Sequence, residues 1–373
     1  MEEIKVQNKG KLRNGYTTGT CAAIAAKASA IMLFTKNVIE KEKIITPKGI
    51  EICVKIYNAE LKDKMVSCGV KKDAGDDPDI TNGVIVYAQV ELIDGTEILI
   101  DGGIGVGRVT KPGLQQKIGE AAINKVPRQM IENEVAKVFS DIGYEGGAKV
   151  IISIPEGVDI AQKTFNPRLG IEGGISVLGT SGIVEPMSEQ ALIDTILVEM
   201  KVKKANGADY LIITPGNYGT DFIKEHMKLD LEQAVKCSNF IGETIDFAME
   251  LNLRGILLVG HVGKFVKLAA GIMNTHSKQA DGRMDVITAN AALEGAPVVV
   301  LEKLMDCVST DEAMKILQET GIMERTMKRI ADRIEYYVAQ RARGELQTGV
   351  VFFSNIYGIL GKTSQVDWLL RRF

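Results

Sequence analysis

The chain has 373 residues, of which 45% are hydrophobic, and its net charge is −3 with a sequence pI near 5.9. This length predicts two or three domains with a substantial core, and the slight acidity excludes nucleic acid as the main partner, because duplex binding requires a basic surface. The N-terminus is polar and the chain lacks an apolar run of ~20 residues, so we expect no membrane span. The five cysteines are dispersed and form no C-x-x-C pair. They predict a cytoplasmic protein without a disulfide framework or zinc site.

A threonine- and glycine-rich turn opens the ordered part of the chain. Thr18 and Thr20 lead into an alanine-rich helix that we expect over residues 22–34. Threonine is a good helix-capping residue, and such a turn can also leave hydroxyl and N–H groups available to an anion. The turn therefore predicts either a simple cap or part of an anion site.

The next segment has the alternation of β-strands. Strands are predicted at 44–46, 50–57, 64–70, 84–92 and 97–100, with turn residues between them. An acidic loop at 73–79 lacks the spacing of an EF-hand, so it is either a solvated loop or a polar rim over a ligand cleft. With a helix at 129–139, residues 1–145 are predicted to form an α+β domain.

The glycine-rich stretch 101–107 imitates a dinucleotide-binding fingerprint. The imitation fails because Pro112 and Gly113 prevent the helix that should follow. What remains is a loop that carries Arg108 and Lys111, two cations suited to carboxylates.

The second half alternates short apolar strands with helices. The strands are predicted at 149–154, 175–178, 210–214, 256–259 and 350–353, and the helices at 187–206, 231–251, 264–272, 286–293, 311–319 and 324–343. This alternation predicts an α/β, doubly wound, Rossmann-like domain with a mainly parallel sheet and a C-terminal helical extension over 146–373. Ligands bind beyond the carboxyl ends of the strands in such sheets. The glycine-rich turns 179–182, 215–219 and 260–263 follow predicted strands. We expect them to share one edge.

Residues 259–285 hold the densest chemistry in the chain. His261, Gly263 and Lys264 lie between a buried strand and a helix, and His276 and Asp281 follow that helix. A nucleotide-binding P-loop is excluded because Leu258 and Phe265 occupy its required glycine and Ser/Thr positions. The residues alone predict a site for a small anionic ligand.

The chain contains several motifs in this order: GYTTGTC at 15–21, DAGDDPD at 73–79, NPRLG at 166–170, GTSGIVEPM at 179–187, and GHVGK at 260–264 with NTH at 274–276. Together they resemble the cobalt-precorrin-5B C1-methyltransferases of anaerobic cobalamin biosynthesis. The resemblance spans nearly the whole chain. One departure is Lys125, where the family pattern leads us to expect proline before Val126-Pro127-Arg128.

The resemblance implies methyl transfer from S-adenosyl-L-methionine to C1 of a cobalt-tetrapyrrole, with no metal site of the protein's own. Histidine suits a general base near neutral pH, so we expect His276, then His261, to serve, with Asp281 as a possible orienting group. The residues expected to bind S-adenosylmethionine are Gly216, Asn217, Gly219, Gly260, Gly263 and Thr180.

The tetrapyrrole carries many carboxylates, so a mildly acidic protein needs local cations to hold it. The arginines and lysines expected to do so are spread over both halves of the chain, which predicts that the substrate binds in a cleft between domains. The residues expected to bind the substrate are Arg13, Thr18, Thr20, Arg108, Lys111, Arg128, Arg168, Lys264 and Arg283. The alternatives are a non-catalytic tetrapyrrole carrier and a kinase or ligase that binds a nucleotide phosphate at Lys264. The oligomeric state stays open.

Overall fold

The computed structural model describes residues 12–216 and 234–373. The chain divides into two compact units, residues 1–188 and 189–373, which we describe separately.

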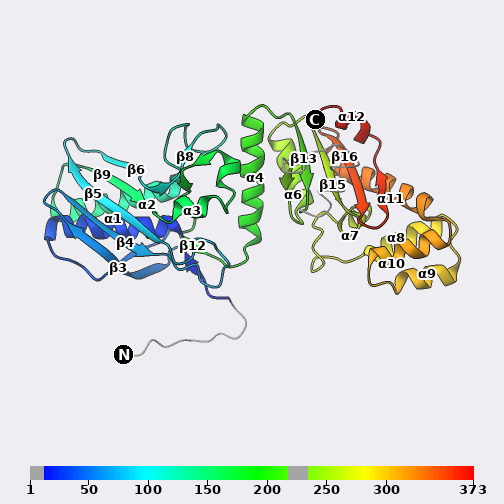
Figure 1. Ribbon diagram of the computed structural model, residues 1–373, viewed down its shortest axis with the longest axis horizontal. Coiled ribbons are helices and arrows are strands. Elements are labelled where there is room, and N and C mark those ends of the chain that lie inside the picture. The colour runs from blue at the N-terminus through cyan, green and yellow to red at the C-terminus, as the bar shows by residue number, and fades with distance from the viewer. Residues whose placement is uncertain (1–11, 217–233) are drawn as a thin grey trace. The chain divides into compact units, whose positions relative to one another are not determined.

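The first unit is built on a six-stranded sheet with the order β2-β3-β4-β5-β9-β6 (Figure 1). Neighbouring strands from β2 to β9 are antiparallel, and β6 runs parallel to β9. The strands are β2 Lys41–Ile45, β3 Glu51–Leu61, β4 Met65–Lys71, β5 Ile85–Ile93, β9 Gly147–Ser153 and β6 Ile98–Gly102.

Helix α1, Thr18–Thr35, is the core of this unit. Burial alternates along β4 and β5, so one sheet face is packed and the other is partly exposed. The small side chains of α1 are almost all buried in the core cluster with those strands and with α2, Lys125–Ile142. Among the described helices, α1 has the length and hydropathy to cross a membrane, but 78% of it is buried inside the unit.

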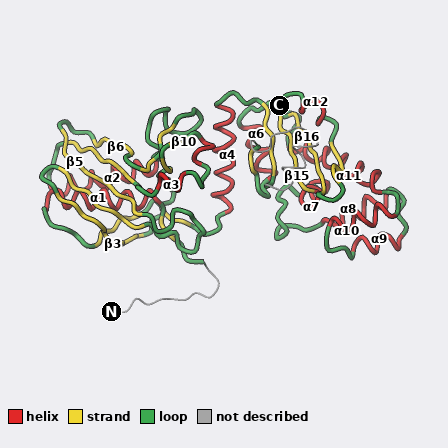
Figure 2. The backbone as a smooth tube through the Cα atoms, in the orientation of Figure 1, coloured by secondary structure: helices red, strands yellow, loops and turns green. Residues whose placement is uncertain are grey.

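The rest of the first unit is mostly loop with very short strands (Figure 2). Three two-stranded pairings tie these loops together, β1 with β12, β8 with β10 and β7 with β11. The elements are β1 Gly15–Tyr16, β7 Gly105–Val106, β8 Arg108–Val109, α3 Gly157–Ala161, η1 Asn166–Leu169, β10 Ile171–Glu172, β11 Gly174–Ile175 and β12 Ile183–Val184.

The boundary between units differs from the predicted one at residue 145. Strand β9 pairs with β5 and β6, so it belongs to the first sheet. The strand predicted over 175–178 as part of the second sheet is instead the short strand β11, which pairs with β7. A local hydrophobic pattern does not show which distant strand a segment pairs with. Because of these pairings, residues 146–188 belong to the first unit.

The second unit contains a five-stranded sheet with the order β14-β13-β15-β16-β17. The first four strands are parallel, and β17 is antiparallel to β16. The strands are β13 Tyr210–Thr214, β14 Val235–Lys236, β15 Gly255–His261, β16 Gln347–Ser354 and β17 Gly358–Lys362. Every residue of β15 but its last is buried, as expected for a strand covered on both faces.

The helices of the second unit mostly match the predicted ones. The helix expected over 231–251 starts at Ile241, because Val235–Lys236 forms strand β14. Helix α9 and strand β17 were not predicted. The helices are α4 Glu189–Ala205, α6 Ile241–Glu250, α7 Val262–Phe265, η3 Val266–Ala270, α8 Arg283–Leu293, α9 Val298–Met305, α10 Thr310–Glu319, α11 Met323–Arg341 and α12 Val366–Leu370.

Candidate functional site

The strand order of the second unit identifies one position for a ligand. After β13 the chain goes to β14 on one side, and then to β15 on the other side of β13. This reversal is a topological switch point, where open α/β sheets bind ligands outside the carboxyl ends of their strands. The carboxyl ends that flank it are Thr214 and His261. We therefore centre the candidate site on these two residues.

His261 ends β15 and caps the following turn. The Gly263 backbone N–H donates to His261 Nδ1 at 3.1 Å. Burial lowers the pKa of His261, and Asp311 only partly opposes that shift, so the ring is neutral at physiological pH. A neutral ring whose Nδ1 accepts a hydrogen bond carries its proton on Nε2. His261 therefore offers a donor to a ligand rather than a basic nitrogen.

Lys264 is a partly buried cation beside this turn. Within the described residues it makes no hydrogen bond or ion pair. Burial lowers its pKa, and Cys237 is the group that opposes the shift. However, burial raises the pKa of the Cys237 thiol to about 12, so this thiol is neutral near pH 7. Among the described residues the Lys264 ammonium therefore has no counter-ion, which suits a carboxylate ligand.

The loop that carries His276 is held at the same edge of the sheet. The Thr275 N–H donates to the Asn239 carbonyl at 2.9 Å, just after the carboxyl end of β14. The Lys267 ammonium, which is 2% exposed, donates to the Thr275 and Ala280 carbonyls at 3.1 and 2.9 Å. The structure thus brings His276 to the edge that holds the Cys237, His261 and Lys264 segments.

The geometry of His276 and Asp281 does not match a base with an orienting carboxylate. His276 Nδ1 accepts the Lys278 N–H at 3.1 Å, so Nε2 is the ring nitrogen left to contact a ligand. Asp281 instead accepts from Arg283 Nε at 2.5 Å and Nη2 at 2.9 Å. In the described part of the chain no hydrogen bond joins Asp281 to His276.

The predicted glycines of this edge have different roles. A Cβ on Gly260 would lie 2.6 Å from the Phe265 ring, so Gly260 is required for packing. A Cβ on Gly263 would meet its nearest atom, His261 Nδ1, at 3.3 Å. The Gly216 carbonyl accepts from Thr214 Oγ1 at 3.0 Å. Asn217 and Gly219 lie outside the described residues.

Comparison with known proteins decides the family. A family model described as CbiD matches residues 5–186, and one described as CbiD, C-terminal domain, matches residues 274–364. A Ruminiclostridium cellulolyticum protein named cobalt-precorrin-5B C(1)-methyltransferase is 50% identical over 95% of this chain and 92% of its own. The chain belongs to the CbiD family. An Alkaliphilus metalliredigens relative of the same name is 43% identical over 99% of this chain and 97% of its own.

A solved CbiD structure from Archaeoglobus fulgidus, titled as a cobalamin biosynthesis protein, is 30% identical, covers 73% of this chain and 84% of its own, and has a TM-score of 0.39. His276 lies inside the range matched by the C-terminal CbiD model, whereas His261 and Lys264 lie between the two matched ranges.

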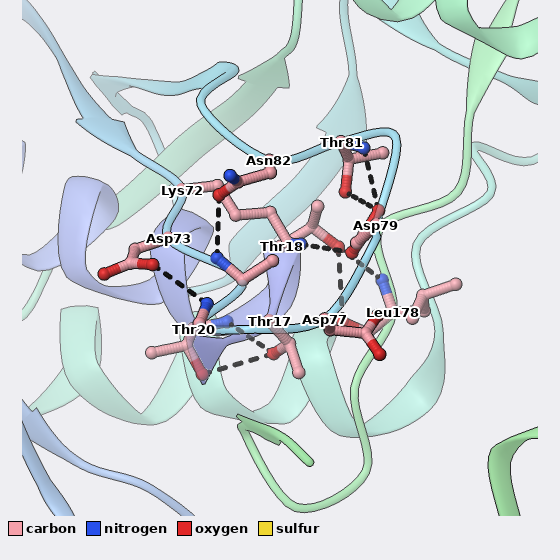
Figure 3. Close-up of polar contacts among 12 residues, drawn as sticks. Thr17, Thr18, Thr20, Lys72, Asp73, Asp77, Asp79, Thr81, Asn82 and Leu178 are labelled. Atoms are coloured by element: carbon pink, nitrogen blue, oxygen red, sulfur yellow. Dashed lines mark hydrogen bonds and ion pairs between the residues drawn. The ribbon is translucent and has the colours of Figure 1, made fainter. Parts of the chain in front are cut away.

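In this CbiD chain the 179–182 turn lies in the first unit, not at the edge of the parallel sheet. The turn covers the start of α1 (Figure 3). Thr18 Oγ1 accepts the Leu178 N–H at 3.0 Å, and Thr20 Oγ1 donates to the Gly182 carbonyl at 2.6 Å. Both threonines are buried and satisfied, so the prediction that they offer hydroxyls to an anion is wrong. Thr180, in the same turn, belongs to the first unit, whereas Gly216 and Gly260 belong to the second.

The acidic loop 73–79 makes several polar contacts with the rest of the first unit, some of them drawn in Figure 3. Asp73 accepts two hydrogen bonds from the Arg13 guanidinium, at 2.6 and 2.8 Å. Asp79 forms an ion pair with Lys72, which is buried, and accepts from the Thr81 hydroxyl at 2.7 Å. The Met187 N–H donates to Asp77 at 2.9 Å.

Three further cations of the CbiD chain already have partners. The Arg108 guanidinium bonds Asp101 at 2.6 and 2.9 Å, and Arg283 bonds Asp281. Arg128 donates to the carbonyls of Ile123, Ile100 and Ala121. These contacts give Arg128 a structural role. Lys111 and Arg168, by contrast, are exposed.

Sequence reasoning missed two features of this edge. From the sequence, Lys267 looks like an ordinary surface lysine. In the structure its buried ammonium holds the 275–280 loop through two hydrogen bonds. Ser354, at the end of β16, donates to Asp311 at 2.8 Å. Neither has a local signal, because burial and cross-element contacts depend on the fold. No group of three or more His, Cys, Asp or Glu that could hold a metal occurs in the described residues.

Proposed function

We propose that this CbiD protein transfers a methyl group from S-adenosyl-L-methionine to C1 of cobalt-precorrin-5B, giving cobalt-precorrin-6A. The observation that carries the proposal is the 50% identity, over nearly the full length of both chains, to a relative named for C1 methylation of this substrate. The cobalt is part of the substrate in this proposal.

The second unit is, in our proposal, a Rossmann-like, doubly wound domain that binds the methyl donor. Its parallel strands and the reversal of strand order between β13 and β15 support this assignment. The donor would lie over the ends of these strands, near Thr214, Gly216 and Gly263. Gly263 follows the end of β15, and its backbone N–H is already bonded to His261 Nδ1.

The residues at this edge fit a ligand with a carboxylate and polar groups. Lys264 would bind a carboxylate, because its ammonium is partly buried and unpaired in the described structure. His261 Nε2–H would donate to a ligand oxygen or nitrogen. The donor supplies an electrophilic methyl group on a sulfonium when bound.

The catalytic contribution of the protein is alignment and exclusion of water. An electron-rich ring carbon must approach the methyl in line, and the positive charge of the sulfonium is lost as the bond forms. In the geometry described, His261 and His276 each use Nδ1 as an acceptor. We therefore assign both histidines to positioning through Nε2–H, in place of the general-base role predicted from sequence.

An isotope experiment tests the activity directly. Cobalt-precorrin-5B is incubated anaerobically with the protein and with S-adenosylmethionine that carries a 13C methyl group, and the product is examined by 13C NMR. We expect one new methyl signal, attached to C1. Label at another ring carbon, or none in the tetrapyrrole, would contradict the proposal.

Calorimetry separates the alternatives. A methyltransferase should bind S-adenosylmethionine but not ATP, and a kinase or ligase should bind ATP. A carrier should bind the tetrapyrrole and consume neither S-adenosylmethionine nor ATP.

A cytoplasmic location, expected from the sequence, remains part of the proposal.

A further inference from the structure

The partly exposed face of the first sheet, opposite α1, carries a row of lysines across three neighbouring strands. Lys41 of β2 lies directly opposite Lys55 of β3 in the antiparallel register. Ile56 of β3 pairs with Val70 of β4, which places Lys55 opposite Lys71 at the next position. Side chains directly opposite each other in an antiparallel pair lie on the same face.

The lysines of this row have no acidic partner among the described residues. Like charges directly opposite on neighbouring strands are destabilising. Lys41, Lys55 and Lys71 form no ion pair with any acid in the part of the chain that the structure describes. An edge-strand lysine such as Lys41 can serve to block aggregation, but β3 and β4 are interior strands. The row is therefore better explained by an anionic ligand.

A cavity of about 360 Å³ lies at one end of the row. Its lining includes Lys55, Lys71 and the rings of Tyr16 and Tyr57. The Tyr16 hydroxyl donates to the Lys71 carbonyl at 2.8 Å, which fixes that ring. The Lys55 ammonium lies 5.5 Å from the centroid of the Tyr57 ring. The cavity thus combines aromatic surface with mobile cations.

The other charged groups of this cavity are already engaged. Lys72 is paired with Asp79, and Asp73 is paired with Arg13. Their charges are locally balanced. The charge left for a ligand comes from Lys55 and Lys71.

We propose that this lysine row and its tyrosine-lined cavity bind the carboxylate-bearing edge of the cobalt-tetrapyrrole. The inference rests on the proposed function for the identity of the ligand. A ring rimmed by acetate and propionate groups matches a sheet face that carries aromatic rings and a line of ammonium groups. Single-stranded nucleic acid shares part of this chemistry, but the net charge of −3 does not favour it.

Binding of a stable tetrapyrrole tests the surface without requiring methyl transfer. The probe is uroporphyrin III, a porphyrin with an acetate and a propionate on every pyrrole ring, and its fluorescence anisotropy is measured with the full chain. The variants are Lys55→Gln, Lys71→Gln and their combination. The matched control is Lys137→Gln, which removes an exposed lysine of α2.

We expect each single variant to raise the dissociation constant by ~3–10-fold and the double variant by ~30-fold, as for partly exposed charge-assisted hydrogen bonds. The control should bind like the unchanged protein. Equal affinity in the double variant and the control would overturn the proposal, as would failure of the unchanged protein to bind the porphyrin.

A measurement on the unchanged protein provides an independent check. Lysine acetylation is mapped by mass spectrometry with and without uroporphyrin III. Lys55 and Lys71 should be protected by the porphyrin and Lys137 should not. Protection by a single-stranded oligonucleotide but not by the porphyrin would overturn the proposal. If the porphyrin result holds while no methyl reaches C1, the proposed activity fails and the binding surface stands.

Discussion

The His261 Nδ1 atom accepts a hydrogen bond from the Gly263 backbone N–H at 3.1 Å. This contact caps the turn after β15 and leaves the ring with its proton on Nε2. One side chain therefore both stabilises the turn and presents a donor at the switch point of the sheet. Substitutions can separate these two roles.

His261→Asn should retain the cap and lose the donor. The asparagine oxygen can accept the Gly263 N–H, whereas nothing replaces Nε2–H. We expect an unfolding free energy within ~0.5 kcal/mol of the unchanged protein and a loss of methyl transfer of ~10–100-fold. His261→Ala should lose activity and, in addition, about 1 kcal/mol of stability. Full activity in the asparagine variant would refute a role for Nε2–H.

The pH dependence of stability should report the same residue. Burial lowers the pKa of His261 in the folded state, while the unfolded chain binds the proton at about pH 6.5. The stability associated with the neutral ring is present above that value and is lost as the pH falls toward the folded pKa, by at most ~1.4 kcal/mol per pH unit. Urea denaturation at about pH 7.5 and about pH 5.5 should show a smaller difference for His261→Asn than for the unchanged protein.

Lys264→Met should stabilise the protein and impair its function. Burial of an unpaired ammonium is unfavourable, and methionine fills a similar volume without charge. We expect an increase in unfolding free energy of ~1 kcal/mol without ligand, together with a loss of ligand affinity of at least about tenfold. Lys201→Met provides a control at another partly buried lysine, on α4. A destabilised Lys264→Met variant would show that the ammonium has a structural partner.

The Lys72–Asp79 pair should behave as a buried ion pair. The Lys72 side chain is 2% exposed and that of Asp79 is 25% exposed. Lys72→Met leaves Asp79 without its counter-ion, so we expect a loss of ~3 kcal/mol in unfolding free energy. The double variant Lys72→Met with Asp79→Leu should recover much of that loss. Additive effects in this double-mutant cycle would contradict direct coupling.

Gly260→Ala and Gly263→Ala form a matched pair. The new methyl at 260 would lie 2.6 Å from the buried Phe265 ring, so we expect a loss of ~2–3 kcal/mol in stability. At 263 the nearest atom would be 3.3 Å away, so stability should change by less than about 1 kcal/mol. If the donor passes close to Gly263, this variant alone should weaken S-adenosylmethionine binding, as measured by calorimetry. Unchanged binding would place the donor elsewhere.

Local patterns in the sequence predicted most of the elements. The alternation along β3, β4 and β5 and the apolar run of β15 were recognisable because side-chain period and burial are properties of neighbouring residues. The motif order along the chain was enough to suggest the family that the comparisons then established. Strand β14 was missed because a two-residue strand has a weak local signal, and helix α9 because it is apolar and has no strong cap. Strand β17, whose five residues include two glycines, was also missed.

Tertiary structure decided which of the polar residues are free for a ligand. Thr18, Thr20, Arg13, Arg108 and Arg128 looked like ligand groups, yet each has a partner within the protein. Except for the Asp101 partner of Arg108, these partners include residues far away in the chain. Lys55 and Lys71 gave no sequence signal, and only the register of β3 against β4 aligns them. Residue type and spacing are properties of the sequence itself, so the family and most helices and strands could be predicted from it. Whether a charge has a counter-ion is set by the packing of segments far apart in the chain.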